Sequence, residues 1–325
     1  MTLSFRRLLA LALALVVCAA SPAYAQAPPT GPLVLHIPTS ARTAALADAW
    51  VAGRDLDVIF RNPAQIIGTR STLDLSLARL GPSSKMLSSG AIYAAGPRSL
   101  TFGWGVQAVG FSAPAVLSYP FDPDITLESG SRNGTSLLVT LGAAFVVKGF
   151  RVGAAGKYVS DVVSGSTAVL NISDSAVVLT PVRVNQHRIL ADFGVARNLF
   201  GGAAAIAVQN IGQHSRNEGL YLPVPRQIAV GWSSTRIAGP IDLGLFSQVT
   251  VRKGWTSPAL GIEAGYSWIE GLNVTLRAGV RRPETNREKP YSFGAAFTFD
   301  RLVTEYAIRF FDGGKAAHGV TLRWR

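Results

Sequence analysis

The feature that most limits how this chain can fold is an alternation of apolar and polar residues that runs from about residue 71 to the end. It comes in segments near ten residues long, separated by turn residues. Between Leu272 and Val280, for example, every second residue is apolar, and the residues between them are Asn, Thr, Arg and Gly. Because successive side chains of a β-strand point to opposite faces, each segment is predicted to be a strand with one apolar face.

The chain is also hydrophobic overall, with a mean hydropathy of +0.27. No stretch beyond residue 25 reaches the roughly 18 apolar residues of a membrane-spanning helix, and the longest candidate, residues 137–147, is interrupted by Thr140. The other structure that satisfies its backbone hydrogen bonds in lipid is a closed barrel of strands. A soluble β-sandwich would alternate too. The barrel is favoured because the face opposite the apolar one is often glycine, alanine, serine or a lone charge.

The predicted strands and their connections complete the barrel pattern. The strands are residues 71–80, 88–96, 99–111, 135–148, 150–163, 186–198, 202–211, 225–234, 240–252, 257–268, 271–282, 290–299, 301–311 and 316–325. With both termini in the periplasm, tight links such as Lys148–Gly149 should alternate with longer outer connections, among them residues 112–134 and 164–185. We therefore predict an all-β fold, a transmembrane antiparallel β-barrel of about 14 strands in residues 71–325, located in the bacterial outer membrane.

The first 25 residues have the order of a secretory signal peptide. Arg6 and Arg7 precede an apolar run, and the small residues Ala23 and Ala25 mark a cleavage site. A lipoprotein signal at Cys18 is the weaker alternative, because the bulky Val17 precedes the thiol. Cys18 is the only cysteine, so a chain cleaved after residue 25 has neither disulfides nor a catalytic thiol.

Residues 26–70 form a segment ahead of the barrel. It begins with several prolines and contains an alanine-rich stretch, residues 44–52, that could form a short helix. The segment is too apolar for a free tail. We predict that it occupies the periplasmic mouth or the lumen of the barrel as a plug.

Short motifs in this segment resemble the N-terminal box of the FadL-like outer-membrane β-barrels, in particular the PorV/PorQ branch. The motifs are Ser40-Ala41-Arg42, Asp48-Ala49-Trp50-Val51-Ala52 and Phe60-Arg61-Asn62-Pro63-Ala64. Residues 208–212, 222–226 and 317–325 extend the resemblance over most of the chain, although Leu46-Ala47-Asp48 and the final Arg325 depart from the family pattern. The resemblance assigns Arg42, Asp48, Asn62, Pro63 and Ala64 to the family box of the plug.

The resemblance implies a fourteen-stranded barrel with an N-terminal plug and one of two functions. The first is a PorV-type component of protein export, as in type IX secretion, that receives or passes on secreted cargo. The alternative is a FadL-like channel for uptake of hydrophobic molecules. For that alternative we expect a surface pocket formed by apolar loop residues, which are Phe111, Tyr119, Phe121, Leu220 and Tyr221.

Eight charged residues are predicted to face the lumen. They are Lys157, Asp192, Asp242, Glu263, Arg277, Glu305, Arg309 and Arg323. Unpaired charges are costly in such an enclosure, so they should pair with one another or with Asp48, Arg54, Asp55, Asp57 and Arg61 of the plug. One interpretation is a structural network that holds the plug, and the other is a selectivity ring for a charged solute. Asn62-Pro63-Ala64 is likewise either a tight turn or the base of a movable plug.

Nothing in the sequence indicates an enzyme, a metal site or a cofactor. The four histidines (His36, His187, His214 and His318) lack metal-ligand spacing, and the glycines of residues 103–108 lie within an alternating strand. The net charge of +12 becomes +10 once Arg6 and Arg7 are removed, and the basic residues form no run of four. The expected partners are therefore outer-membrane lipid and lipopolysaccharide, with secretion-system subunits and secreted cargo or a hydrophobic small molecule, and not nucleic acid.

Overall fold

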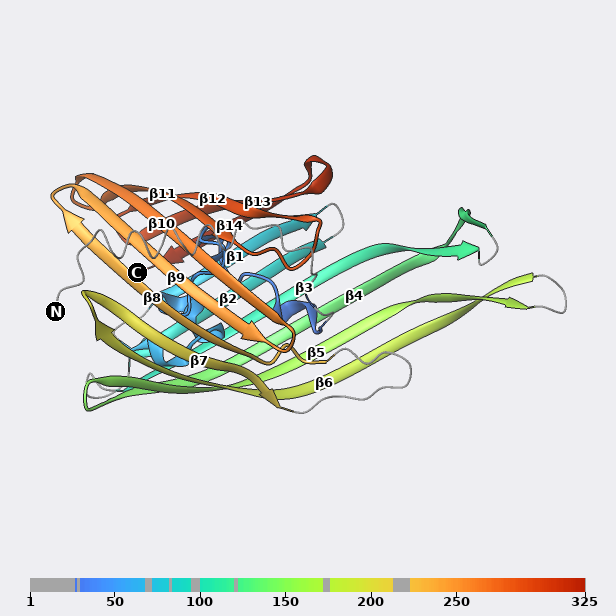
Figure 1. Ribbon diagram of the computed structural model, residues 1–325, viewed down its shortest axis with the longest axis horizontal. Helices are drawn as coiled ribbons and strands as arrows, with labels where there is room; N and C mark the ends of the chain where they lie inside the picture. The colour runs from blue at the N-terminus through green and yellow to red at the C-terminus, as the bar shows by residue number, and fades with distance from the viewer. Residues whose placement is uncertain are drawn as a thin grey trace.

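The computed structural model describes residues 27, 30–67, 72–81, 84–94, 100–119, 122–171, 176–212 and 223–324. Within these residues, fourteen antiparallel strands close into one barrel (Figure 1). Each strand pairs with its neighbours along the chain, and the ring closes between the first and last strands, where Leu73 lies opposite Trp324. The predicted all-β, fourteen-stranded fold is confirmed. The predicted signal peptide, residues 1–25, lies outside the described residues.

The strands follow one another with short connections at one end. They are β1 (Thr72–Gly81), β2 (Ser84–Ala94), β3 (Leu100–Tyr119), β4 (Asp122–Val147), β5 (Phe150–Asn171), β6 (Ala176–Leu199), β7 (Gly202–Gly212), β8 (Gln227–Ala238), β9 (Ile241–Arg252), β10 (Trp255–Ile269), β11 (Leu272–Arg281), β12 (Glu288–Phe299), β13 (Leu302–Phe311) and β14 (Ala316–Trp324). The turns Lys148–Gly149 and Phe200–Gly201 have positive φ at both residues, the geometry that two-residue hairpin turns favour. We call this the periplasmic end and the opposite one the outer end.

The apolar face of each strand points away from the barrel axis. On β11, Leu276 is 62% exposed, whereas its neighbour Arg277 is 7% exposed. Ile189 on β6 and Leu141 on β4 are exposed to a similar degree as Leu276. A surface that exposes its large apolar residues and buries its charges suits hydrocarbon and not water, so the chain is an outer-membrane barrel. Within the described residues, no helix has the length and apolar character to cross a membrane.

Exposed aromatic residues gather at the periplasmic end. They are Phe150, Phe200, Trp268, Phe299 and Trp324, which lie at strand ends or in the turns between strands. In outer-membrane barrels, aromatic residues at the two ends of the apolar band form girdles at the membrane interfaces. Trp268, Phe299 and Trp324 lie at the periplasmic ends of β10, β12 and β14.

The two longest predicted outer loops, residues 112–134 and 164–185, are instead continuations of the strands. The pair β3–β4 remains hydrogen-bonded as far as Tyr119 opposite Asp122, and β5–β6 as far as Asn171 opposite Ala176. Both hairpins project past the other strands at the outer end (Figure 1). A two-stranded ribbon pairs its own backbone groups wherever the chain doubles back, so it does not need the rest of the barrel to continue. The loop prediction was wrong for these stretches.

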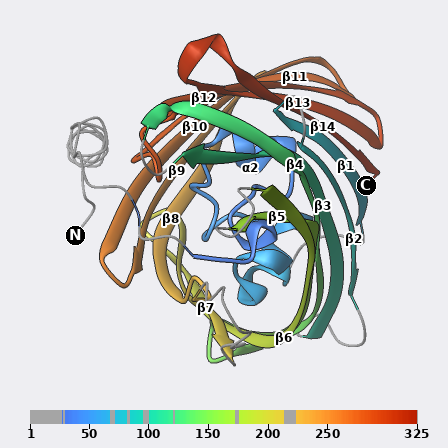
Figure 2. The ribbon, with the colours of Figure 1, turned by 90° about the vertical axis from the view of Figure 1, so that its right-hand side faces the viewer.

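Residues 30–67 lie inside the barrel (Figure 2). This segment, called the lumen segment below, contains η1 (Leu33–Leu35), α2 (Ala41–Ala45), η2 (Leu56–Phe60) and η3 (Pro63–Ile66). Helix α2 contacts β11 to β14, and η3 contacts β4 to β6, on another side of the wall. At the outer end, the backbone N–H of Ala27 donates to Glu284 O and that of Gly31 to Pro223 O. The segment therefore extends from the outer end down into the lumen before β1 begins.

The helix in this segment lies earlier than the alanine-rich stretch at residues 44–52 suggested. Ser40 begins α2, since its Oγ accepts a hydrogen bond from the Thr43 N–H at 3.1 Å. Ala47 and Asp48 have positive φ and end the helix. The N-cap and the two left-handed residues thus decide the helix position, and the alanines alone do not.

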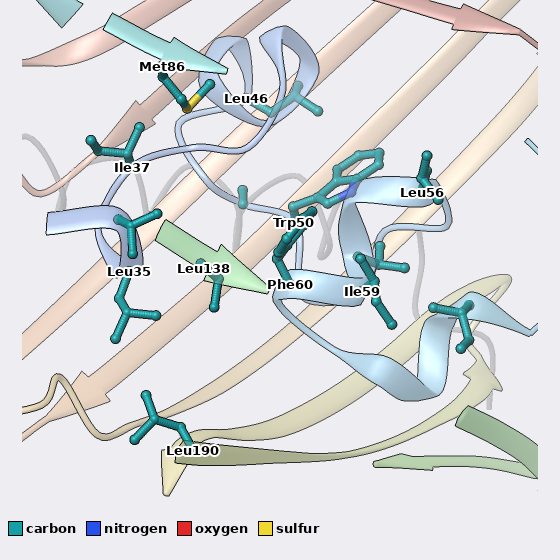
Figure 3. Packing of buried hydrophobic residues seen from close by; sticks show 14 of the residues in the cluster. Leu35, Ile37, Leu46, Trp50, Leu56, Ile59, Phe60, Met86, Leu138 and Leu190 are labelled. Atoms are coloured by element: carbon teal, nitrogen blue, oxygen red, sulfur yellow. The ribbon is translucent and has the colours of Figure 1, made fainter. Parts of the chain in front are cut away.

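The core of the molecule is the contact between the lumen segment and the wall. Trp50, Leu56 and Ile59 of the segment are at most 2% exposed and belong to one apolar cluster with Leu138 and Leu190 of the wall (Figure 3). The Trp50 ring lies 5.0 Å from the ring of Phe246 on β9. Burial of these side chains away from water is what holds the segment in the barrel.

Inward glycines let the segment backbone approach the wall closely. A Cβ added at Gly194 would lie 1.9 Å from Asn62 Oδ1, and one added at Gly153 would lie 2.5 Å from the Ala64 backbone nitrogen. On the opposite wall, a Cβ at Gly279 would lie 2.5 Å from the Ala47 nitrogen. Only residues without a side chain fit at these positions, so the wall matches the path of this segment.

Candidate functional site

The largest charged cluster joins the lumen segment to β10, β11, β13 and β14. Arg42 on α2 donates from Nε to Glu263 Oε1 at 2.7 Å and also pairs with Asp55 of the segment. Arg277 donates to the same Glu263 at 2.7 Å and pairs with Glu305 at 3.0 Å. Burial alone would lower the pKa of the Arg42 guanidinium, but Glu263 and Asp55 raise it well above its ordinary value.

Arg323 connects the remaining carboxylates of this cluster. It is fully buried and lies 2.6 Å from Asp55, 3.5 Å from Glu305 and 3.5 Å from Asp74. We call the set the central cluster: Arg42, Asp55, Asp74, Glu263, Arg277, Glu305 and Arg323. Each of its three arginines contacts at least two of its four carboxylates, and such pairing is the condition for keeping charges away from water.

Asp57 lies beside this cluster. Its carboxylate accepts hydrogen bonds from Ser40 Oγ and, at 3.0 Å, from Trp50 Nε1. Burial raises the pKa of Asp57 above its ordinary value, and the nearby Arg323 partly opposes that rise. Asp57 therefore connects the capped start of α2 to the apolar core.

A second cluster holds the end of η2 against the opposite wall. Lys157 on β5 lies 2.6 Å from Asp192 on β6, and its Nζ also donates to Phe60 O at 3.1 Å and to Asn210 Oδ1 at 3.0 Å. Asn210 has positive φ at a register shift between β6 and β7, and its N–H donates to Asp192 at 2.7 Å. This register shift turns the backbone N–H of Asn210 toward Asp192 in the cluster.

A third cluster lies toward the outer end. Asp48 accepts from Arg61 at 3.3 Å and pairs with Arg281, which lies 2.6 Å from Glu288. Arg309 pairs with the same Glu288. Thus Arg309 joins a group separate from the central cluster. Asp242 joins none of the three in the described part of the chain; it accepts a hydrogen bond from Asn273 at 3.4 Å.

Asn62, Pro63 and Ala64 form the start of η3 deep in the lumen. Asn62 is fully buried; its Oδ1 accepts from the Ala64 N–H at 3.1 Å, and its Nδ2 donates to Val51 O at 2.9 Å. This geometry agrees with the tight-turn interpretation. The Asn62 side chain caps the start of η3 and also binds the backbone of the lumen segment at Val51.

Several inward charges were missing from the sequence prediction: Asp74, Arg252, Arg281, Glu284 and Glu288. The alternation signalled two of them, because Asp74 stands opposite the apolar leucines of β1 and Arg281 shares the face of Arg277. Glu288 was missed for another reason, since β12 begins there and not at residue 290 as predicted. Glu284 lies in the connection after β11, where the alternation gives no signal.

An apolar cavity of about 300 Å³ lies between the lumen segment and β1, β13 and β14 toward the outer end. We call it the outer pocket. Its apolar lining includes Leu33, Ile37, Ala41, Ala44, Leu80, Met86, Ala307, Phe311 and Ala317. Its polar and charged lining residues are His36, Ser40, Ser76, Arg281, Glu284, Thr285, Glu288, Arg309 and His318. The walls of the outer pocket therefore come from the lumen segment and the barrel.

The surface pocket predicted from apolar loop residues falls mostly outside the described part of the chain. Phe121, Leu220 and Tyr221 lie outside the described residues, as does the side chain of Tyr119. Phe111 is described but does not line the outer pocket. The apolar residues that form the outer pocket belong to elements distant in sequence, which only the closed barrel brings together.

Glu284, in the connection after β11, pairs with the lumen segment, and its contribution to stability should depend on pH. It lies 3.2 Å from His36 Nδ1 and 3.1 Å from Arg252. Burial alone would raise the pKa of Glu284, but His36, Arg281 and Arg252 lower it well below its ordinary value. A carboxylate with a lowered folded pKa stabilises the fold above the unfolded pKa of about 4.3 and stops doing so as the pH falls toward the folded value.

We therefore expect Glu284→Gln to lower the free energy of unfolding by about 1 kcal/mol at neutral pH. The difference from the parent protein should shrink as the pH falls below about 4.3. Denaturant titrations of both proteins between pH 7 and pH 3 measure it, with Glu270→Gln in an exposed periplasmic turn as control. A difference that stays constant over this range would contradict the assignment.

Two further cavities open at the periplasmic end, about 560 and 670 Å³ in volume. Both are lined in part by Arg42 and Thr235. The larger is also lined by Asp242, Glu263 and Arg277. Both spaces combine charged and polar groups with apolar side chains, and the lumen segment lies between them and the outer pocket.

Comparison with known proteins places the fold in a functional context. No known protein family matches the sequence, and no curated protein matches it. Among solved structures, the CymD monoaromatic hydrocarbon channel is 10% identical with a TM-score of 0.60, covering 88% of this chain and 97% of that one. The Pseudomonas putida toluene transporter TodX is 10% identical with a TM-score of 0.52, covering 82% and 92%. A TodX deletion variant, deltaS2S3, is 10% identical with a TM-score of 0.58, and the match covers 87% of this chain and 97% of that one.

At such low identity these matches establish the shared barrel fold. The chain is thus similar in fold to FadL-like hydrocarbon channels, and these matches do not support the PorV/PorQ branch that the sequence motifs suggested. The quoted motifs are short, and the choice between the two branches remains a prediction.

Proposed function

We propose that this protein is an outer-membrane channel for small hydrophobic molecules, which bind first in the outer pocket. The observation that carries the proposal is the apolar cavity of about 300 Å³ between the lumen segment and the wall toward the outer end. A mostly apolar cavity with a few polar groups at its edge is the usual form of a site for such ligands. The fold shared with channels described as carrying monoaromatic hydrocarbons and toluene points the same way.

In this proposal the lumen segment acts as a plug and forms one wall of the binding site. Its apolar residues pack against the strands in the middle of the barrel, and the three charged clusters fix it on different sides. The lumen-facing charges then serve as attachments for the plug and not as a selectivity ring. Outer-membrane lipid covers the apolar outward face, and contact of the outer end with lipopolysaccharide remains a prediction.

Ala44→Phe tests the proposal, because Ala44 lines the outer pocket and is only partly buried. A phenyl ring there would remove burial of about 80 Å² of ligand surface, worth roughly 2 kcal/mol at about 25 cal/mol per Å². We expect about 30-fold weaker binding of toluene to the purified barrel. Cells carrying the variant should take up labelled toluene more slowly than cells carrying the parent protein.

Ala154→Phe on the outward face of β5 is the matched control, since it makes the same change outside the lumen and away from the outer pocket. Equal toluene binding by the parent protein and Ala44→Phe would reject the outer pocket as the site. A gene deletion separates the two functions implied by the sequence resemblance. If toluene uptake were unchanged while surface-attached proteins were lost, the export function would replace the channel function.

A further inference from the structure

At the periplasmic end two arginines meet, and neither has a carboxylate partner among the described residues. Arg54 of the lumen segment donates from Nη2 to Asn198 Oδ1 at 2.5 Å, and Arg151 on β5 donates from Nη1 to the same oxygen at 2.9 Å. One neutral oxygen thus receives both guanidinium groups. In the three clusters described above, each arginine contacts at least one carboxylate.

Arg151 is 8% exposed, and its Nε and Nη2 have no hydrogen-bond partner among the described residues. Its neighbours across the sheet are Val146 on β4 and Ala196 on β6, which are both apolar. Buried polar groups in proteins are nearly always hydrogen-bonded, and a buried charge normally has a counter-charge. We therefore expect the Nε and Nη2 donors of Arg151 to bind an acceptor that is not part of the described chain.

The difference from Arg42 supports this interpretation. Partial loss of hydration lowers the pKa of the Arg54 guanidinium below its ordinary value, while the residue as a whole stays exposed. The pKa of Arg42, which has two carboxylate partners, is instead raised well above that value. A guanidinium whose environment disfavours its charge is one to which an anion would bind favourably.

The space for such an anion is the periplasmic cavity of about 560 Å³, which Arg54 and Asn198 line. Arg151 lies behind this lining and is joined to it through the Asn198 oxygen that both arginines share. Its lining also includes the aromatic residues Trp50, Phe200 and Phe246 and the hydroxyl residue Thr235, and it contains no Asp or Glu. Arg42 lies at the same cavity, with its guanidinium 4.5 Å from the Trp50 ring. The cavity thus offers positive charge beside apolar surface.

From this arrangement we infer that Arg54, Arg151 and Asn198 form a binding site for an oxyanion, a carboxylate or phosphate group, at the periplasmic end of the lumen. Planar guanidinium groups pair with both kinds of oxyanion through two parallel N–H donors. The apolar lining of the cavity favours an anion that carries an apolar body, such as a small aromatic acid. This site lies on the other side of the lumen segment from the outer pocket and does not depend on the proposed channel function.

Titration of the purified full-length barrel in neutral detergent with sodium benzoate and, separately, inorganic phosphate tests the site. Binding is followed by calorimetry and by the fluorescence of tryptophan, since Trp50 lines the cavity. We expect saturable binding by the parent protein that weakens at least tenfold in Arg54→Gln and Arg151→Gln. Arg54 is exposed, so its substitution leaves the buried wall intact even if Arg151→Gln fails to fold.

Lys253→Gln is the charge-matched control, because Lys253 is exposed in the turn after β9 at the outer end. Equal affinity in the parent protein and Arg54→Gln would overturn the site, as would the absence of saturable binding by the parent protein. Repeating the benzoate titration in nanodiscs with and without phosphatidylglycerol identifies the source of the oxyanion. Competition by the anionic lipid would assign the site to a headgroup, and unchanged affinity would assign it to a free acid.

Discussion

Replacing Arg323 with Met is expected to destabilise the barrel by about 3–5 kcal/mol, the cost of removing one partner from a buried ion pair. Arg323 is fully buried and lies within 3.5 Å of Asp55, Asp74 and Glu305. Methionine has similar length and fills the space, so the loss would report on charge and not on volume. Urea unfolding of the barrel in lipid vesicles measures the difference.

Arg301→Met is the control for this prediction, since Arg301 is exposed in the turn between β12 and β13. It should change the free energy of unfolding by less than about 0.5 kcal/mol. Adding Asp55→Asn to Arg323→Met should recover part of the stability, because it removes one of the negative charges that Arg323 no longer offsets. Equal unfolding free energies for Arg323→Met and Arg301→Met would show that the central cluster does not hold the fold.

Replacing Gly153 with Val is expected to displace the lumen segment from the wall. The first carbon of the new side chain would lie 2.5 Å from the Ala64 nitrogen and 2.7 Å from Pro63 O. These are backbone atoms, so η3 cannot avoid the contact by a change of rotamer. We expect a loss of about 1–3 kcal/mol or more, the usual cost of overpacking. Ion conductance through single barrels in a planar bilayer should rise as the lumen opens.

Gly156→Val on the same strand is the matched control, because nothing lies within 4 Å of an added Cβ there and the residue faces outward. It should leave both the conductance and the free energy of unfolding unchanged. If Gly153→Val behaved like Gly156→Val, the close fit between wall and segment would have no part in keeping the lumen closed.

The strands could be predicted from the sequence because their pattern is local. One face of each strand meets hydrocarbon and the other meets the lumen, so the alternation around Leu276 and Arg277 directly records their 62% and 7% exposure. The same rule placed Glu305 and Arg323 inside. The extent of the β3–β4 hairpin was not predictable in this way, because beyond the membrane neither face is required to be apolar.

The path of the lumen segment could not be derived from local pattern. Its position depends on contacts such as Asn62 with Gly194 and Phe60 O with Lys157, which join residues more than 90 positions apart. Inward glycines were visible in the sequence, but their meaning depends on what passes beside them. The paired arginines Arg54 and Arg151 are also far apart in sequence, and only β5 and the segment together bring them to one oxygen.

The course of the lumen segment has a consequence for assembly in the membrane. The chain at Ala27 and Gly31 bonds to connections at the outer end, whereas the ring is closed by pairing of β1 with β14, the last strand to be synthesised. The segment is joined directly to β1, so it can take its place while the sheet is still open. Closure by β14 then encloses it, and no free end has to be threaded through a finished ring.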